Sequence, residues 1–598
     1  MKKLALIATL ALATLGAHAA PPVTTLLPES TFLVAGTPNW TAMREGIERS
    51  PLGGLWEEPS IRAFLRPLTE DFGSEFGLTG TDSVISVDEF NRLFPGQIYV
   101  GIQRFSLVNG APDIAPFFVA ETSQPERVLE IVDTLLERAG AQQQRDTYAV
   151  QDVTVQRNAL RIGADSDIPG METQTDPFTG TKQGSSGAMS ERAFTLHTAV
   201  SDGLVMMSID QPLEAVISNL RGGGDGGLAA SEVTQRAANL IGNPQGDLVF
   251  QMNFAPVDQM IRSSPDTQQY FNAAALGIGD FETLNLVVDF GPDSTENWTA
   301  LTLKPNPTGL GRLLRHAHAG EYSALDWVPA NVASVSGLGY DIPAAYNDFK
   351  MILMNASPMM GMMISSGLMS ANSSLGFDVE NDLIRSLGDE FVTYTPLPAE
   401  GAEGEVSPSV MIFSLSNPTG LESVFARLSA EPVVGSTQVS GQTQALIRKE
   451  FLGQPFYTPP PVFNDPDMAA QLPAFAVVGG QLVFSTSVPE LQSVIAASQG
   501  QIEQSVRGSA LWNRLGPVQM EGATGFSYQD DAAVMANVST SLEQMAMMFV
   551  MMPEFAPPLD FSRVPEPEVF ERHLTHTVSS TRIDERGLVS HGRSPHSE

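Results

Sequence analysis

The sequence predicts an α+β protein of two related modules, each a mainly antiparallel sheet with helices covering one face. Three observations predict this fold. Short runs of β-branched and aromatic residues alternate with helical patterns, glycine-containing turns link neighbouring strand-like runs, and similar segments recur in the same order in both halves of the chain. A parallel α/β sheet is the alternative that the alternation of strands and helices also allows.

The strands are predicted from short runs rich in valine, isoleucine, phenylalanine and tyrosine. Two turns, Ser201-Asp202-Gly203 and Gly479-Gly480, separate neighbouring runs by few residues, as in antiparallel hairpins. The clearest strand-like runs are 97–103, 117–121, 204–209, 247–254 and 284–289.

The helices are predicted to begin at a recurring junction in which Ser or Asp is followed by any residue and then proline. A Ser or Asp side chain can accept bonds from the first free N–H groups of a helix, and proline is tolerated in the first turn. The junctions begin at Ser123, Asp210, Ser416 and Ser487, with a looser version at Asp341. Ser487 with Glu490 also has the spacing of a capping box.

A repeat relates the two halves of the chain. Three pairs of segments match in order, and their offset shrinks steadily, which is typical of one duplicated module with shorter loops in its second copy. The pairs are 26–36 with 327–337, 116–132 with 409–425, and 201–217 with 479–495. The repeat predicts a first α+β module over 20–318 and a second, methionine-rich module over 319–598.

The N-terminus has the pattern of a secretory signal. Two lysines are followed by an apolar run over residues 4–15 and then by small residues, so cleavage is predicted between Ala19 and Ala20. The signal peptide would cover residues 1–19. It is not expected to be a membrane anchor, because the apolar run is shorter than the roughly 20 residues that a membrane span needs. We therefore expect an exported protein, periplasmic or associated with the cell envelope.

Composition excludes several classes of function. The chain has no cysteine, so neither disulfides nor thiolate chemistry is available to it. Its formal net charge is −35, which repels phosphate backbones and argues against nucleic-acid binding. No later stretch has the length and apolarity of a transmembrane helix.

Four features point to a family: the signal pattern, the opening Leu27-Pro28-Glu29-Ser30-Thr31, the segment 50–55 and the junctions described above. Together they resemble a bacterial exported family catalogued as domain of unknown function 3352. The resemblance covers nearly the whole chain after the signal. It implies export and this organisation. The family has no assigned chemistry, so the resemblance implies no activity.

No catalytic or cofactor motif is present, so we predict no catalytic residues, no cofactor and no metal site. The chain lacks a phosphate loop, a nucleophile elbow and a zinc-protease helix. The pairs His316 with His318 and His573 with His576 could each supply two metal ligands, but no carboxylate completes either site locally. We interpret them as surface histidines.

Methionine is the most unusual local feature, because it clusters in two short stretches near 351–369 and 535–552. Three interpretations are open. The helices are buried core, they present a soft surface to an apolar ligand or an envelope protein, or their thioethers bind copper(I). The candidate ligand- or partner-binding residues are Met359, Met360, Met363, Met547, Met548 and Met551.

These observations predict an exported, non-enzymatic binding or scaffolding protein of the cell envelope, with its working surface in the second module. Its ligand and partner are unknown. One alternative is an extracytoplasmic hydrolase that uses a pair of carboxylates with raised pKa. The other alternative is a copper-binding protein.

Overall fold

A computed structural model describes residues 20–75, 85–108, 111–138, 142–162, 192–223, 227–242, 246–263, 272–397, 407–430, 445–460, 472–551 and 559–596. The predicted signal peptide, residues 1–19, lies outside these residues. The chain folds as two compact units. Unit 1 comprises Met1–Glu45, Leu68–Arg236 and Gly246–Pro256, and unit 2 comprises Gly46–Pro67, Ala237–Gln245 and Val257–Glu598.

The sheet of unit 1 is antiparallel in every described pairing, in the order β8-β1-β2-β3-β7-β6-β5-β4. Its strands are β1 Leu33–Thr37, β2 Ile98–Val108, β3 Ala111–Glu121, β4 Gln142–Val150, β5 Val153–Ile162, β6 Arg192–Ser201, β7 Leu204–Ile209 and β8 Leu248–Asn253.

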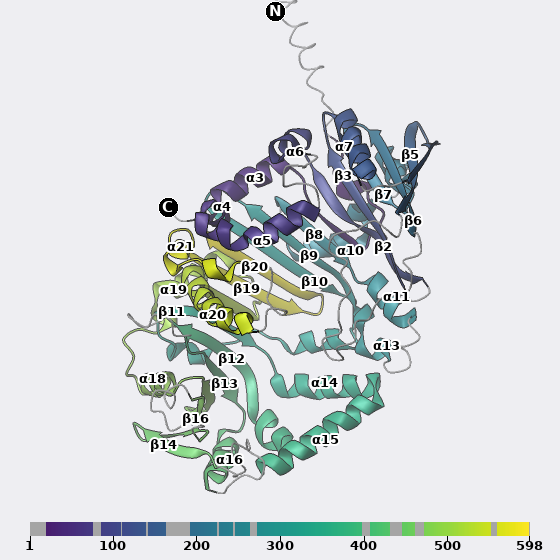
Figure 1. The fold of residues 1–598 in the computed structure, drawn as a ribbon. Helices are drawn as coiled ribbons and strands as arrows, with labels where there is room; N and C mark the ends of the chain where they lie inside the picture. The colour runs from purple at the N-terminus through teal and green to yellow at the C-terminus, as the bar shows by residue number, and fades with distance from the viewer. Residues whose placement is uncertain are drawn as a thin grey trace, which may run out of the picture. The chain divides into compact units, whose positions relative to one another are not determined.

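Unit 2 also has an antiparallel sheet, in the order β9-β10-β20-β19-β18-β11-β12-β13-β17-β16-β15-β14. Figure 1 shows β11, β12 and β13 side by side within it. Its strands are β9 Phe281–Phe290, β10 Ser294–Leu303, β11 Val332–Gly339, β12 Leu387–Pro396, β13 Val410–Leu415, β14 Ile447–Phe451, β15 Gln454–Thr458, β16 Ala474–Val478, β17 Gln481–Ser485, β18 Gly525–Asp530, β19 His576–Asp584 and β20 Gly587–Pro595. The α+β fold is confirmed, and the parallel alternative is wrong.

Helices connect these strands. The helices with residues in unit 1 are α2 Val23–Leu26, α3 Trp40–Arg49, α5 Pro59–Glu75, α6 Val87–Leu93, α7 Pro125–Arg138, α8 Glu214–Leu220, α9 Gly227–Ala230, α10 Glu232–Leu240 and α11 Ala255–Ser263. Those wholly in unit 2 are α4 Pro51–Glu57, α13 Ala273–Leu276, α14 Ile342–Ala356, α15 Pro358–Leu375, α16 Pro418–Ala430, α18 Val488–Ser498, α19 Ala510–Arg514, α20 Asp531–Met551 and α21 Pro567–Glu571. Short 3₁₀ or π turns in unit 2 are η1 Ile278–Asp280, η2 Leu310–His316, η3 Ser323–Asp326, η4 Val379–Leu383, η5 Ile384–Ser386, η6 Val506–Gly508, η7 Gly516–Val518 and η9 Phe561–Arg563.

Helices pack on both faces of the sheets at β7 and β17, whereas the sequence predicts helices on one face. In unit 1, Leu204 and Met206 of β7 join a buried cluster with α8, whereas Val205 between them joins another with α7. In unit 2, Val483 of β17 packs in a cluster with α18, and Leu482 packs in one with α16. Because successive strand residues point to opposite faces, an uninterrupted apolar run in a strand indicates two covered faces.

The predicted hairpin turns are confirmed. Asp202 and Gly203 link β6 to β7, and Gly479 and Gly480 link β16 to β17. All four residues have positive φ, from 51° to 82°, as the tight turns that match strand twist require.

The predicted helix junctions hold in part. Asp341 caps α14, but Ser487 makes no capping bond at the start of α18. At α16 the cap is Asn417, whose Oδ1 accepts the N–H of Gly420 at 3.1 Å. Ser416 is not the cap because its hydroxyl donates to backbone carbonyls of the preceding segment, Arg385 and Leu387.

The two sheets share one strand order. Eight neighbouring strands of unit 2 repeat the strand order of the whole sheet of unit 1. They are β18-β11-β12-β13-β17-β16-β15-β14, in which β11 takes the place of β1, β12 that of β2, and so on to β18 and β8. The compact units nevertheless divide the chain elsewhere than at the predicted module boundary of 318/319. Strands β9 and β10 fall in unit 2 because β10 pairs along its length with β20, a contact between residues almost 300 positions apart that local patterns do not reveal.

Candidate functional site

The first methionine cluster forms a pair of helices, α14 and α15, whose break is set by a proline. The Oδ1 of Asp341 accepts the N–H of Ala344 at 2.9 Å and starts α14. The residue before a proline is held in extended backbone, and Ser357 before Pro358 has φ −152° and ψ 113°. Helix α14 therefore ends at this point. The Oγ of Ser357 accepts the N–H of Met360 at 3.4 Å and starts α15.

Helix α14 is the covered member of this pair. It contacts α13, η2 and β12 and buries Ala345, Ile352 and Ala356. Helix α15 contacts α14 and η4, and Figure 1 shows it along the edge of this part of unit 2, below α14. The two helices come close at Gly361, where a Cβ atom would lie 2.9 Å from the Cγ of Met354.

The exposed methionines of α14 and α15 form an apolar surface that we call the methionine face. Its members and their exposed fractions are Met351 47%, Met354 47%, Met359 55%, Met362 67%, Met363 65% and Met369 65%. Of the predicted binding residues, Met359 and Met363 belong to it, whereas Met360 is half-buried. The six side chains are thus not core. Helix α15 also has no Asp, Glu, Lys or Arg, so this surface is uncharged in a strongly acidic chain.

The second methionine cluster lies on α20. The side chains of Met547, Met548 and Met551 are outside the described residues, so their predicted role stays a prediction. Met535 is half-buried, and Met545 is 37% exposed.

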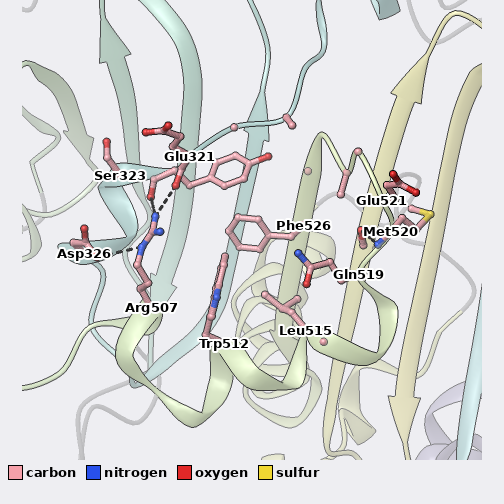
Figure 2. Close-up of a pocket in the computed structure, with 18 residues that line it drawn as sticks. Glu321, Ser323, Asp326, Arg507, Trp512, Leu515, Gln519, Met520, Glu521 and Phe526 are labelled. Carbon is pink, nitrogen blue, oxygen red and sulfur yellow. Dashed lines mark hydrogen bonds and ion pairs between the residues drawn. The ribbon is translucent and has the colours of Figure 1, made fainter.

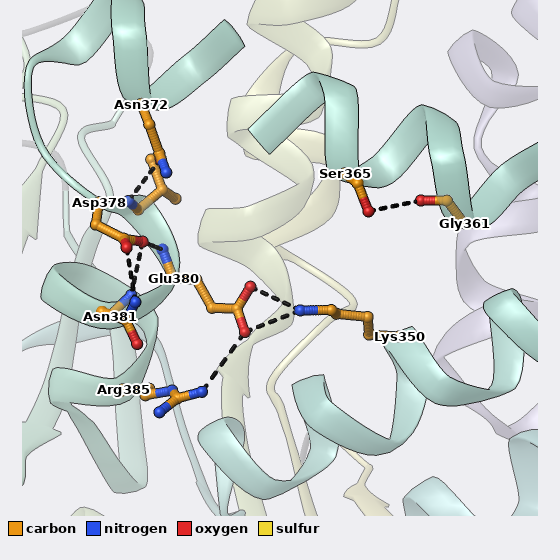
Figure 3. A network of polar contacts seen from close by, with 9 residues as sticks. Lys350, Gly361, Ser365, Asn372, Asp378, Glu380, Asn381 and Arg385 are labelled. Carbon is orange, nitrogen blue, oxygen red and sulfur yellow. Dashed lines mark hydrogen bonds and ion pairs between the residues drawn. The ribbon is translucent and has the colours of Figure 1, made fainter. Parts of the chain in front are cut away.

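A polar network ties the helix pair to the turn that follows it (Figure 3). The Nζ of Lys350 on α14 lies 2.9 and 2.8 Å from the two carboxylate oxygens of Glu380 on η4. Arg385 lies 3.7 Å from the same carboxylate. Lysine is scarce in this chain, and Lys350 uses its charge to link α14 to the segment that follows α15.

The start of η4 is organised by Asp378. Its carboxylate accepts the backbone N–H groups of Glu380 and Asn381, each at 3.0 Å, and the side-chain amide of Asn381 at 2.6 Å. These bonds from Asn381 hold the pKa of Asp378 below its ordinary value. Helix α15 ends at Gly376, whose φ of 71° is favourable for glycine.

Two of the four histidines considered as metal ligands, His316 and His573, contact carboxylates. The Nε2 of His316 and the Nε of Arg312 each lie 2.8 Å from one oxygen of the buried Asp348. The Nε2 of His573 lies 2.7 Å from Glu58, and the hydrogen bond from His573 lowers the pKa of that carboxyl. Within the described ranges, no group of three or more His, Cys, Asp or Glu residues is arranged to hold a metal ion.

Among the residues that the structure describes, two carboxyl groups have the raised pKa that a hydrolase needs, Glu490 and Asp531, and in both the first cause is burial. No second carboxylate contributes to the shift at Glu490. Asp531 accepts bonds from the side chains of Thr577 and Gln529, and the neighbouring carboxylate of Asp530 adds to burial in raising the pKa of Asp531. Neither carboxyl group lines the cavity described next, and the hydrolase alternative stays a prediction.

Sequence reasoning missed a cavity of about 940 Å³ in unit 2 (Figure 2). It is bounded by 319–326, by residues of 507–526 and by Ser580. These segments are far apart in the sequence and none carries a known motif. The only local signal is the pair Trp512 and Arg507, in a protein with five tryptophans.

No family model, curated protein or solved structure matches the chain. The resemblance to domain of unknown function 3352 therefore stays a prediction. Among the described helices, none is long and apolar enough to cross a membrane.

Proposed function

We propose that this chain is an exported, non-enzymatic protein of the cell envelope whose methionine face binds an apolar segment of a partner polypeptide. The observation that carries the proposal is the exposure of six methionines on a helix pair whose outer helix has no charged residue. Several large apolar side chains exposed on one pair of helices are a frequent mark of an interaction site.

Methionine suits this role because its side chain is unbranched, polarisable and able to adapt its shape. Surfaces rich in methionine accept partner helices of differing sequence by repacking. A groove or face of this kind binds the apolar side of an amphipathic helix.

A polypeptide partner is favoured over a lipid surface by charge. Helices that lie in membrane interfaces combine an apolar face with lysine and arginine on the polar face. Helix α15 has neither of these residues, and the chain as a whole carries −35. Anionic headgroups would repel such a protein.

Export rests on the N-terminal pattern of charge, apolar run and small residues, and the absence of cysteine is compatible with an oxidising compartment. The shared strand order of the two sheets supports the proposed duplication of one module. A duplicated scaffold in which one copy gained methionine would place the binding surface in the second copy.

The test replaces the four most exposed methionines, Met359, Met362, Met363 and Met369, by glutamine. The protein is purified from the exported fraction, where its first residue should be Ala20. The probe is a synthetic uncharged amphipathic helix of leucine and serine, labelled for fluorescence anisotropy. We expect the glutamine variant to bind at least tenfold more weakly, because it loses apolar contact area across the whole face.

The matched control replaces the same four methionines by leucine, which keeps the surface apolar. It should bind within about threefold of the parent, because volume-conserving apolar exchanges change little. Circular dichroism should be the same for all three proteins. Unfolding of the glutamine variant, equal binding by parent and glutamine variant, or binding to neutral lipid vesicles in place of the peptide would each contradict the proposal.

A further inference from the structure

The cavity around Arg507 lies beside a turn with an unfavourable backbone conformation. Tyr322 has φ 50° and ψ 51°, a left-handed conformation that is unfavourable for a large side chain. A residue keeps such a conformation where several surrounding contacts fix its backbone, and residues of this kind concentrate at functional sites. We call residues 320–323 the Tyr322 turn.

Two charged groups hold this turn from opposite sides. The carboxylate of Glu390 accepts the N–H groups of both Glu321 and Tyr322, the latter at 3.1 Å. The Nη2 of Arg507 donates to the carbonyl oxygens of the same two residues, at 2.6 and 2.7 Å. The Tyr322 hydroxyl donates to the carbonyl of Thr524 at 2.7 Å. The turn is therefore fixed before any ligand arrives.

Aromatic rings form one wall of the cavity. Phe526 packs edge-on against Tyr322 and against Trp512, with ring centroids 5.1 and 5.2 Å apart. Leu515 and Met520 extend the apolar lining. Figure 2 shows Trp512, Phe526 and Leu515 among the lining residues and Arg507 directed toward Glu321 and Ser323. This wall suits a flat or compact apolar body.

The ionisable groups of the lining are mainly acidic. The Nε of Arg507 lies 3.2 Å from Asp326, so this carboxylate and the two carbonyls already occupy its guanidinium group. The other charged lining residues are Glu321 and Glu521, both exposed at the rim. With Arg507 balanced by Asp326, these two carboxylates leave the rim negative, in a protein whose whole field attracts cations.

We propose that this cavity binds an organic cation, a positively charged ammonium group attached to an apolar body. The guanidinium of Arg507 already lies over the Trp512 ring, 5.9 Å from its centroid. Phe526, Leu515 and Met520 would take the apolar body, and the cation would gain from the two rim carboxylates. The site is independent of the methionine face, which involves none of its residues.

The test titrates the full exported protein with benzyltrimethylammonium by calorimetry at about 20 mM salt, where exposed charges are weakly screened. Benzyl alcohol and benzenesulfonate carry a similar ring with no charge and with a negative charge. We expect one site for the cation, with affinity at least tenfold higher than for either analogue. Replacing Glu321 and Glu521 together by glutamine should weaken cation binding by roughly three- to tenfold.

A filling variant tests the location. Gly516 lines the cavity, and a Cβ atom there would meet nothing within 4 Å, so Gly516→Leu should fold and obstruct the cavity. We expect it to lose at least tenfold in affinity. Gly508→Leu is the matched control, because Gly508 has similar room, with the nearest atom at 3.9 Å, and does not line the cavity. It should bind like the parent.

Several outcomes would overturn the proposal. They are equal binding of benzyl alcohol or benzenesulfonate, unchanged binding by Gly516→Leu, an equal loss in Gly508→Leu, and no saturable binding up to about 10 mM, which corresponds to less than 3 kcal/mol. Should Gly516→Leu fail to fold, the rim variant decides, since both of its side chains are exposed. The glutamine variant of the methionine face should still bind the cation, so the two proposals fail separately.

Discussion

Helices α15 and α18 make an instructive comparison, because both are apolar and both have a serine at the N-cap and a proline in the first turn. In α18, Leu491, Val494 and Ile495 are completely buried. In α15, by contrast, Met362 and Met363 are about two-thirds exposed. Apolar content alone therefore does not decide whether a helix in this protein is covered.

The difference lies in what each helix packs against and not in the spacing of its apolar residues. The buried residues of α18 are spaced three and four apart and form one stripe over β16 and β17. Met359, Met362 and Met363 of α15 have the same three-and-four spacing, and yet all three are exposed. Helix α15 packs on another helix, α14, and so keeps most of its circumference free.

The largest expected contrast is in stability. Leu491→Ala should lower the free energy of unfolding by about 2–5 kcal/mol, because it removes buried methyl groups and leaves a cavity. Met362→Ala should change it by less than about 0.5 kcal/mol, as exposed substitutions do. Urea unfolding of both variants measures the contrast. A loss of about 2 kcal/mol or more in Met362→Ala would mean that α15 is covered after all.

Several of these features were predictable from the sequence because they are local. The tight turns at Asp202-Gly203 and Gly479-Gly480 need residues that tolerate positive φ, and those residues are visible in any window of the chain. Asp341 before Pro343 predicted the start of α14 for the same reason. Where several polar side chains are near, the cap was not predictable, as Asn417 in place of Ser416 shows.

The candidate sites were less predictable because they depend on contacts between distant residues. Periodicity left the burial of α15 open, since the sequence does not show which element this helix packs on. Arg507 binds backbone carbonyls at positions 321 and 322, which any residue type could supply. The pairing of β10 with β20 likewise joins segments that local patterns treat as unrelated.

A smaller effect is expected at the helix starts. Ser357→Ala should cost about 0.5–1 kcal/mol, because Oγ accepts the N–H of Met360, although the distance of 3.4 Å is long. Ser487→Ala, at the corresponding position of α18, should cost less, since its side chain makes no capping bond. Thermal unfolding of the two variants gives the order. The reverse order would show that the Ser357 bond does not stabilise α15.

The smallest effect on overall stability is expected from Lys350→Met, and it should be confined to one part of unit 2. The ion pair with Glu380 is partly buried, and its loss should cost about 0.5–1 kcal/mol, with Arg385 at 3.7 Å able to compensate in part. Since the pair links α14 to the turn beyond α15, the loss should appear as faster hydrogen exchange in α15 by severalfold, with α18 unchanged. Uniform acceleration in both helices would indicate that the pair stabilises all of unit 2. Acceleration confined to α15 would mean that this ion pair positions the methionine face independently of the core, which is the property that a surface adapting to its partner requires.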